Sequence, residues 1–228
     1  MTPVHRALVL FDIDGTLVRR AGPHHRAALV HAIRRVMGLE TTTEGIPVQG
    51  MLDPLILSVM LRAAGVPAKA IGAAMPEMVK AAERYYLRVC PDIQDKLCPG
   101  VVPVLERLTR RGALLGLVTG NLTRIGWRKL ERAGLHKYFR FGAFGEMAKN
   151  RAGLARLAIR EARTRGWIEW GTAISLIGDA PQDIQAARAN RIRAISVKTG
   201  ITPAGELEQL QPDLLLRDLR ELRLRMVE

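Results

Sequence analysis

The stretch Ala7-Leu-Val-Leu-Phe-Asp12-Ile-Asp14-Gly15-Thr16 decides the fold of this 228-residue chain. Its first five residues are an uninterrupted apolar run of strand length, which is typical of a strand buried on both faces of a parallel sheet. Carboxylates and a glycine follow directly where the run ends. Ligands of open α/β sheets bind beyond the carboxyl ends of the strands, so we expect Asp12 and Asp14 at the rim of a functional site.

Similar apolar runs recur farther along the chain, at residues 113–118, 174–177, 194–197 and 213–216. Between them lie amphipathic segments that we predict as helices, at residues 101–111, 122–133, 152–165 and 183–189. Because strands and helices alternate, the sequence predicts an α/β fold, a Rossmann-like doubly wound parallel sheet.

One long segment interrupts this alternation. Residues 17–96 contain helical patterns, at 25–37, 52–64 and 76–89, and no convincing strand. A helical block inserted after the first strand is expected to cover the strand ends as a cap. We therefore expect an α/β core domain made of residues 1–16 and 97–228, and a helical cap domain made of residues 17–96.

Polar residues also follow two later strands. Thr119, Gly120 and Asn121 end the second run, and Asp179 and Asp183 follow the third. Several carboxylates at one rim repel one another unless a cation compensates their charge. Oxygen ligands without nearby His or Cys favour a hard cation, and Mg²⁺ is the usual one when phosphate is also bound.

The glycines of this rim, Gly15 and Gly120, allow backbone amides to approach an anion closely. Carboxylates, a metal ion, a hydroxyl group and amide-lined loops together suit phosphoryl transfer. The sequence therefore predicts a site for a phosphorylated ligand.

These motifs, in this order, resemble those of the haloacid dehalogenase-like hydrolase superfamily. The run from Asp12 to Thr16 resembles the first motif, residues 115–121 the second, and residues 178–189 the fourth. The helical insert matches the C1 cap of that family, and the whole pattern is most similar to its phosphoglycolate phosphatase-like branch.

The resemblance implies a role for each acidic residue. Asp12 would attack phosphorus and form an aspartyl-phosphate, and Asp14 would act as general acid and then general base. Mg²⁺ would be held by the carboxylates of Asp12 and Asp179 and by the backbone carbonyl of Asp14, with Asp183 supporting the metal site. Thr119 would hydrogen-bond a phosphoryl oxygen, next to Gly15, Gly120 and Asn121 as further phosphate-binding residues.

The family also requires a cation that neutralises the nucleophile and the phosphoryl group. We favour Lys149, which lies nine residues before the helical run at Ala158, although Asn150 stands where the family usually has Pro. Arg151 is the competing candidate for this catalytic and phosphate-binding role.

Residues of the insert are expected to determine the substrate specificity. The loop 49–53 resembles a cap loop of the family, with Leu52 in place of Thr, and the segment 24–26 could meet an anionic substrate. Asp14 argues against dehalogenase chemistry, because haloacid dehalogenases lack this residue. We expect hydrolysis of a small phosphorylated metabolite; a phosphosugar mutase and a non-catalytic nucleic-acid-binding module are the alternatives.

The chain is strongly basic, with 35 Lys and Arg against 22 Asp and Glu and a net charge of +13. Residues 105–170 alone contribute a net charge of +10. We interpret them as solvated helix faces rather than a nucleic-acid surface. Cys90 and Cys98 form no disulfide framework, and no run approaches the ~20 apolar residues of a membrane span. We expect a cytoplasmic monomer or homodimer with no membrane partner.

Overall fold

The computed structural model describes residues 4–19 and 22–227. Its centre is a six-stranded sheet in the order β3-β2-β1-β4-β5-β6, and all neighbouring strands are parallel. The strands are β1 (Ala7–Phe11), β2 (Leu114–Val118), β3 (Phe141–Ala143), β4 (Ala173–Gly178), β5 (Arg193–Val197) and β6 (Leu214–Leu216). This arrangement confirms the doubly wound α/β fold.

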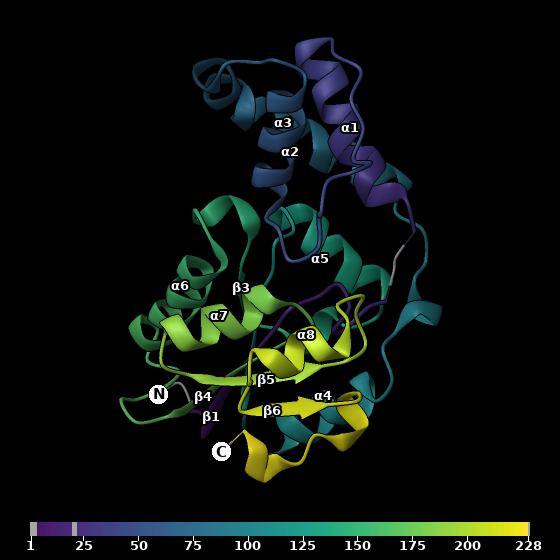
Figure 1. Cartoon of the computed structure of the whole chain (residues 1–228). Coiled ribbons are helices and arrows are strands. Elements are labelled where there is room, and N and C mark those ends of the chain that lie inside the picture. The colour runs from purple at the N-terminus through teal and green to yellow at the C-terminus, as the bar shows by residue number, and fades with distance from the viewer. Residues whose placement is uncertain (1–3, 20–21, 228) are drawn as a thin grey trace.

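Helices cover both faces of the sheet and form a separate layer above its strand ends (Figure 1). The layer above the sheet contains α1 (His24–Met37), α2 (Asp53–Ala63) and α3 (Ala68–Val89). The helices of the core are α4 (Val101–Arg110), α5 (Thr123–Arg132), α6 (Arg151–Thr164), α7 (Pro181–Ala189) and α8 (Ala204–Gln209). Short 3₁₀ turns lie at Gln94–Lys96, His136–Tyr138, Gly145–Met147, Leu219–Glu221 and Leu224–Met226.

Strand β1 is buried on both faces, as its apolar run predicts. Val9 and Phe11 belong to one core cluster, together with apolar residues of α4 and α5. Leu8 and Leu10 point to the opposite face and pack in a second cluster with residues of α6, α7 and α8. The sheet therefore holds β1 rigidly from two sides, and this fixes the position of the residues that follow it.

Three elements differ from the sequence prediction, and one of them is the short helix α8, which was not expected. Strand β3, at residues 141–143, was not expected, because three residues that include Gly142 give no periodic apolar signal. Helix α3 begins at Ala68, so Pro76 lies inside it rather than at its start. Pro76 lacks the backbone N–H that would donate a hydrogen bond within the helix. Helix α3 continues through it because the apolar face of α3 is buried against α1, which stabilises the helix.

The helical insert has its own core and also contacts the α/β domain. Its cluster includes Leu57, Met60 and Tyr86, and it extends onto Leu122 and Ile125 at the start of α5. These core-domain side chains seat the cap over the ends of β1 and β2. Both cysteines are buried and free. Within the described residues, no helix is long and apolar enough to cross a membrane.

Candidate active site

The sheet order places the ends of β1 and β4 side by side. These strands are direct neighbours, and the connections leave them in opposite directions, toward β2 on one side and β5 on the other. Such a switch point leaves a crevice at the carboxyl ends of the strands. The Asp12 amide donates to the Ile177 carbonyl at 2.9 Å, so Asp12 and Asp179 leave the sheet next to each other.

Asp12, Asp179 and Asp183 form a buried carboxylate cluster. One oxygen of each lies within 4.8 Å of the others, and the three residues are 2–4% exposed. Burial, together with repulsion from the neighbouring carboxylates, raises the pKa of Asp179 well above its usual value. Burial is also the main cause that raises the pKa of Asp183 to about 7.

These residues fit a divalent cation. The donors are all carboxylate oxygens, as Mg²⁺ prefers. Asp12 Oδ1 and Asp183 Oδ1 are buried and accept no well-aligned hydrogen bond among the described residues, although each lies 3.0 Å from Arg151 Nη1. A cation would relieve the repulsion that raises the carboxyl pKa values. The cluster can therefore hold a metal ion, with Asp183 as a direct member of the group and the side chain of Asp14 outside it.

Gly15 leaves room for the Asp179 carboxylate because it has no side chain. Its φ angle is +85°, in the left-handed region, and a Cβ atom at this position would overlap the Asp179 carboxylate. Its amide, however, donates to the Val18 carbonyl at 2.8 Å. The structure therefore assigns Gly15 to the turn and to the space around Asp179, whereas the sequence suggested an amide directed at phosphate.

Arg151, at the start of α6, is the cation that the structure brings to the carboxylates. Its Nη1 lies 3.0 Å from both Asp12 Oδ1 and Asp183 Oδ1, and the side chain is 5% exposed. Burial would lower its pKa, but the two carboxylates outweigh this effect and raise it, so the guanidinium stays charged. Nη1 also donates to the Val118 carbonyl at 3.1 Å, which anchors the group to β2.

The positions of the two candidate cations favour Arg151 over Lys149, which the sequence preferred. The Lys149 side chain is exposed, two residues before the helix start, whereas Arg151 lies in the first turn of α6 and points into the crevice. Asn150 caps this helix by accepting from the Gly153 amide at 2.9 Å. The spacing from Ala158 could not separate the two candidates, because it says nothing of which side chain faces the sheet.

Thr119 and Asn121 lie at the end of β2, facing the first motif. Thr119 is fully buried, and its hydroxyl accepts from Asn121 Nδ2 at 2.7 Å. The same amide group of Asn121 also donates to Asp14 Oδ2 at 2.8 Å. Asn121 thus holds Asp14 in place, whereas the phosphate-binding role that the sequence suggested for it stays a prediction.

Lys129 is a site residue that sequence reasoning missed. It lies on α5, is 1% exposed, and donates to both oxygens of Asp14 at 2.7 and 2.6 Å. Burial would raise the pKa of Asp14, but the Lys129 ammonium is the main group that lowers it below its usual value. The only signal in the sequence was a Lys on the apolar face of a predicted amphipathic helix, between Ile125 and Leu130.

The cap reaches this site through His25 and the loop before α2. His25 Nδ1 lies 3.2 Å from Lys129 Nζ, and its Nε2 lies 2.9 Å from Asp53 Oδ2. Asp53 Oδ2 also accepts from the Leu122 amide at 2.8 Å, and Gln49 donates to Asp179 Oδ2 at 3.3 Å. The cap therefore closes over the carboxylates, and His25, expected only as a possible substrate contact, joins the site.

Mg²⁺ is expected to stabilise the protein more at about pH 8 than at about pH 5.5. Raised pKa values mean that the folded state binds more protons than the unfolded state between the ordinary carboxyl value of 3.8 and about 7 for Asp183. The free energy of unfolding of the metal-free protein therefore falls as pH rises through this window. Mg²⁺ requires the deprotonated carboxylates, so its effect on Tm grows over the same range.

Thermal unfolding with and without Mg²⁺ at both pH values measures this effect. Asp179→Asn should abolish most of the Mg²⁺-induced rise in Tm, whereas Asp95→Asn, at an exposed position of the cap connection, should leave it unchanged. An equal Mg²⁺ effect at both pH values would contradict a metal site on these protonatable carboxylates.

The comparisons with known proteins agree with this geometry. The sequence profile of the haloacid dehalogenase-like hydrolases matches residues 7–190. A phosphoglycolate phosphatase of Agrobacterium fabrum is 26% identical over 222 residues, covering 94% of this chain and 90% of that protein. One from Synechococcus elongatus is 32% identical over 129 residues, which span only 56% of this chain and 58% of that protein.

Solved structures share the fold. The crystal structure of CbbY from Rhodobacter sphaeroides in complex with phosphate has a TM-score of 0.72 at 19% sequence identity. The match covers 98% of this chain and 99% of that one, including the cap.

Proposed function

Because the chain belongs to the haloacid dehalogenase-like hydrolase family, we propose that it is a Mg²⁺-dependent phosphatase that hydrolyses a small phosphomonoester through an aspartyl-phosphate on Asp12. The observation that carries this proposal is the buried group of Asp12, Asp179 and Asp183 with the Arg151 guanidinium 3.0 Å from two of them. The positive charge of Arg151 and of Mg²⁺ at this group would neutralise a transferring phosphoryl group.

In the first half of the reaction, an Asp12 oxygen attacks phosphorus, and the bond from phosphorus to the ester oxygen breaks. Arg151, 3.0 Å from Asp12 Oδ1, keeps Asp12 oriented and offers a charge to the phosphoryl oxygens. Thr119, fully buried at the end of β2, is in position to donate its hydroxyl hydrogen to one of those oxygens, because its oxygen already accepts from Asn121. Bound Mg²⁺ would supply charge neutralisation at the carboxylates of Asp12, Asp179 and Asp183.

In the second half, water attacks the phosphorus of the aspartyl-phosphate and Asp14 accepts its proton. The bond from phosphorus to the Asp12 oxygen breaks, which frees the Asp12 carboxylate and inorganic phosphate. The lowered pKa of Asp14 keeps this carboxyl ionised, as a base requires. To donate a proton to the leaving alkoxide in the first half, Asp14 must first be protonated and separate from the Lys129 ammonium. Cap movement that withdraws His25, which belongs to α1, would favour this protonation, because His25 is one of the groups that lower the pKa of Asp14.

The closed cap, together with the names of the relatives of this chain, supports a small phosphomonoester as the substrate. Loop 49–53 covers the carboxylates, so the leaving group must fit between the cap and Asp14. His25 of the cap lies beside the pair of Asp14 and Lys129 and suits a leaving group that carries a hydroxyl or a carboxylate. Phosphoglycolate or a sugar phosphate has this character, and relatives of the chain are named phosphoglycolate phosphatase.

A screen of phosphorylated metabolites with and without Mg²⁺ tests the proposal. Phosphoglycolate, sugar monophosphates and nucleotides are each incubated with the enzyme, and inorganic phosphate and isomerised sugar phosphate are measured. Release of phosphate that requires Mg²⁺ supports the phosphatase. Isomerised product without free phosphate would identify a mutase instead, and no turnover of any substrate would contradict an enzyme of this class.

Lys129→Met is expected to lower kcat/KM by about 10–100-fold and to move the acidic limb of the pH profile to higher pH. Lys129 lowers the pKa of Asp14, so its removal leaves less of the Asp14 carboxylate ionised at a given acidic pH. The measurement is the pH dependence of aryl phosphate hydrolysis in Mg²⁺.

Lys137→Met is the matched control, because Lys137 lies exposed beyond the end of α5. Its pH profile should equal that of the wild type. A Lys129→Met profile that is lower but not shifted would show that Lys129 serves packing rather than the protonation of Asp14.

A further inference from the structure

An open cleft of about 950 Å³ lies at the edge of the sheet where β4 and β5 begin. The carboxylates of the candidate active site follow the opposite ends of these strands. A strand of five or six residues spans about 17–20 Å, so the cleft is well separated from the phosphatase site. Its volume falls in the range of about 300–1,000 Å³ that small-molecule sites occupy.

The cleft is strongly positive. Its lining carries five arginines, Arg156, Arg160, Arg163, Arg191 and Arg193. Asp213 is the one carboxylate among the lining residues, and its Oδ2 already accepts from the Ala194 amide at 2.7 Å. Among the ion pairs of residues 4–19 and 22–227, none involves Arg156, Arg160, Arg163 or Arg191. These charges therefore remain available to an anion.

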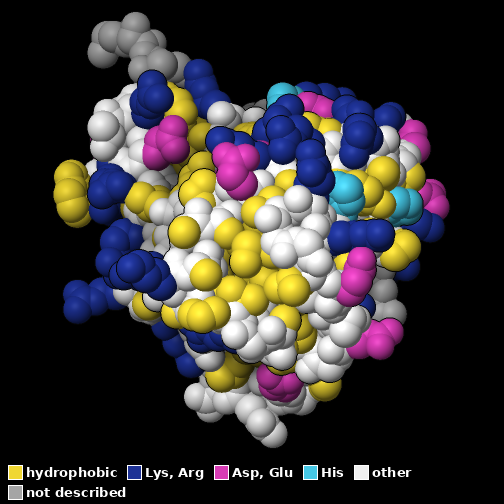
Figure 2. Space-filling view, turned by 90° about the horizontal axis from the view of Figure 1, so that it is seen from above, with side chains coloured by type: hydrophobic (Ala, Val, Ile, Leu, Met, Phe, Trp, Pro, Cys, Tyr) yellow, Lys and Arg dark blue, Asp and Glu magenta, His cyan; other side chains and the backbone are white. Residues whose placement is uncertain are grey.

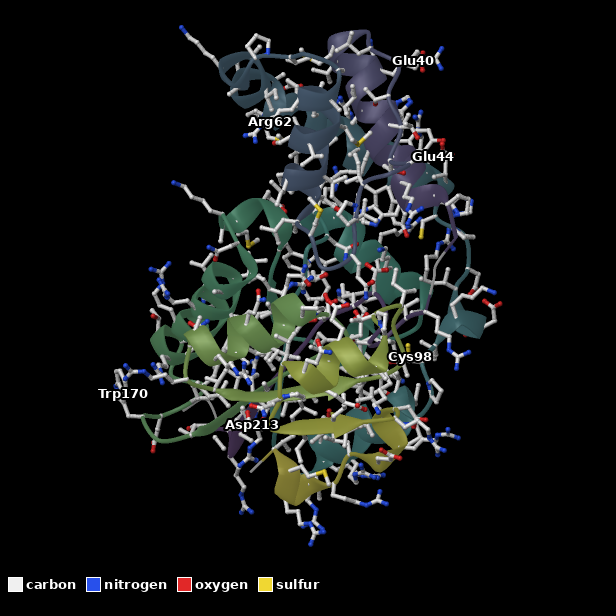
Figure 3. The ribbon with its side chains drawn as sticks, in the orientation of Figure 1. Glu40, Glu44, Arg62, Cys98, Trp170 and Asp213 are labelled. Atoms are coloured by element: carbon white, nitrogen blue, oxygen red, sulfur yellow. The ribbon has the colours of Figure 1, made fainter. Side chains whose placement is uncertain are left out.

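An aromatic side chain stands at the mouth of the cleft. Trp170 is 85% exposed and projects from the loop between α6 and β4, as Figure 3 shows. The Arg163 guanidinium lies 4.2 Å from the centroid of its ring. An exposed indole next to guanidinium groups offers a stacking surface for a planar aromatic ring beside a site for phosphates.

One polar group of the cleft lining lacks a partner. The buried Nε of Arg163 has no hydrogen-bond partner in the described structure. Buried polar groups of folded proteins are normally hydrogen-bonded. A phosphate oxygen in the cleft would give this group the acceptor that it lacks.

We propose that this cleft binds a nucleoside polyphosphate, with the phosphates on Arg156, Arg160 and Arg163 and the base stacked on Trp170. The three arginines share one face of α6, at spacings of four and three residues, and so form a short row that matches a phosphate chain. A nucleic acid would need a longer basic track. The cap-side face, which lies away from the cleft, offers no such track either. On that face, Lys and Arg side chains lie mostly toward the edge, with apolar and neutral groups in the middle (Figure 2).

Calorimetric titration of the full-length protein with a non-hydrolysable ATP analogue tests this site. The double variant Arg156→Glu/Arg160→Glu should raise Kd at least about tenfold, because each phosphate loses a charged donor and meets a like charge. Trp170→Ala should raise Kd about fivefold or more, and should leave the affinity for inorganic tripolyphosphate unchanged. Arg62→Glu, at an exposed position of the cap, is the control and should bind as the wild type does.

Hydrolysis of aryl phosphate in the Arg156→Glu/Arg160→Glu variant should equal that of the wild type, which separates this site from the phosphatase site. The variant residues are exposed, so the fold is expected to persist. Wild-type affinity in the double variant would overturn the proposal. Unchanged ATP-analogue affinity in Trp170→Ala would refute the nucleoside part of it. Tighter binding of a short single-stranded RNA, lost in the same double variant, would replace the nucleotide by a nucleic acid.

Discussion

Asp12→Asn should reduce kcat for aryl phosphate hydrolysis in Mg²⁺ by at least about 1,000-fold. The amide has nearly the shape of the carboxylate but cannot form the aspartyl-phosphate, and it gives the metal site one charge less. The fold should survive, since Arg151 keeps Asp183 as a partner and the change removes one of three carboxylates that repel one another. Steady-state kinetics with circular dichroism of the same sample measures both effects.

Asp95→Asn is the matched control for this change, at an exposed Asp near the end of the cap. It should hydrolyse aryl phosphate at the wild-type rate. A folded Asp12→Asn protein that keeps wild-type turnover would mean that Asp12 is not the nucleophile.

Arg151→Met should have the second largest effect. Loss of the guanidinium removes the charge that lies 3.0 Å from Asp12 and Asp183, so we expect kcat to fall by about 100–1,000-fold. Breaking a buried ion pair by removing one partner costs about 3–5 kcal/mol, so Tm should fall as well. Mg²⁺ should recover part of the lost stability, because it compensates the same carboxylates. Kinetics and thermal unfolding, with and without Mg²⁺, separate the two losses.

Two further variants complete this experiment. Arg151→Lys keeps a charge but not the contact geometry of the guanidinium, and should retain more activity than Arg151→Met. Lys149→Met changes the exposed cation two residues earlier and should leave kcat unchanged. Loss of activity in Lys149→Met with a normal Arg151→Met enzyme would restore the assignment that the sequence favoured.

The acidic rim was predictable because it depends on local sequence and on one topological rule. Asp12 and Asp179 each follow an apolar run directly, and parallel strands bring their carboxyl ends to the same edge. The edge strand β3 gave too short a signal to be predicted, yet it does not alter the rim. The order of the strands and the residues that follow them were thus sufficient to place the carboxylates together, and the side-chain orientations were not needed.

Cations at the site could not be predicted in the same way. Lys149 and Arg151 differ by two residues, and the choice between them depends on where α6 begins and which side chain then faces β2. Lys129 was missed because its partners cannot be recognised from the sequence. Asp14 lies far away along the chain, and Asn121 lies nearby but carries no charge that would mark it as a partner of a lysine. The cap's contribution through His25 likewise depends on where the fold places α1 relative to Lys129 of α5.

The sequence by itself determined the α/β fold, the helical insert after β1 and the carboxylates Asp12, Asp14, Asp179 and Asp183. Each of these is encoded by residues within a few positions of a strand end. Tertiary structure alone decided that Arg151 neutralises the carboxylates and that Lys129 and His25 hold or adjoin Asp14. The physical reason is that a buried charge is stabilised only by partners in space, and these partners come from separate helices and from the cap.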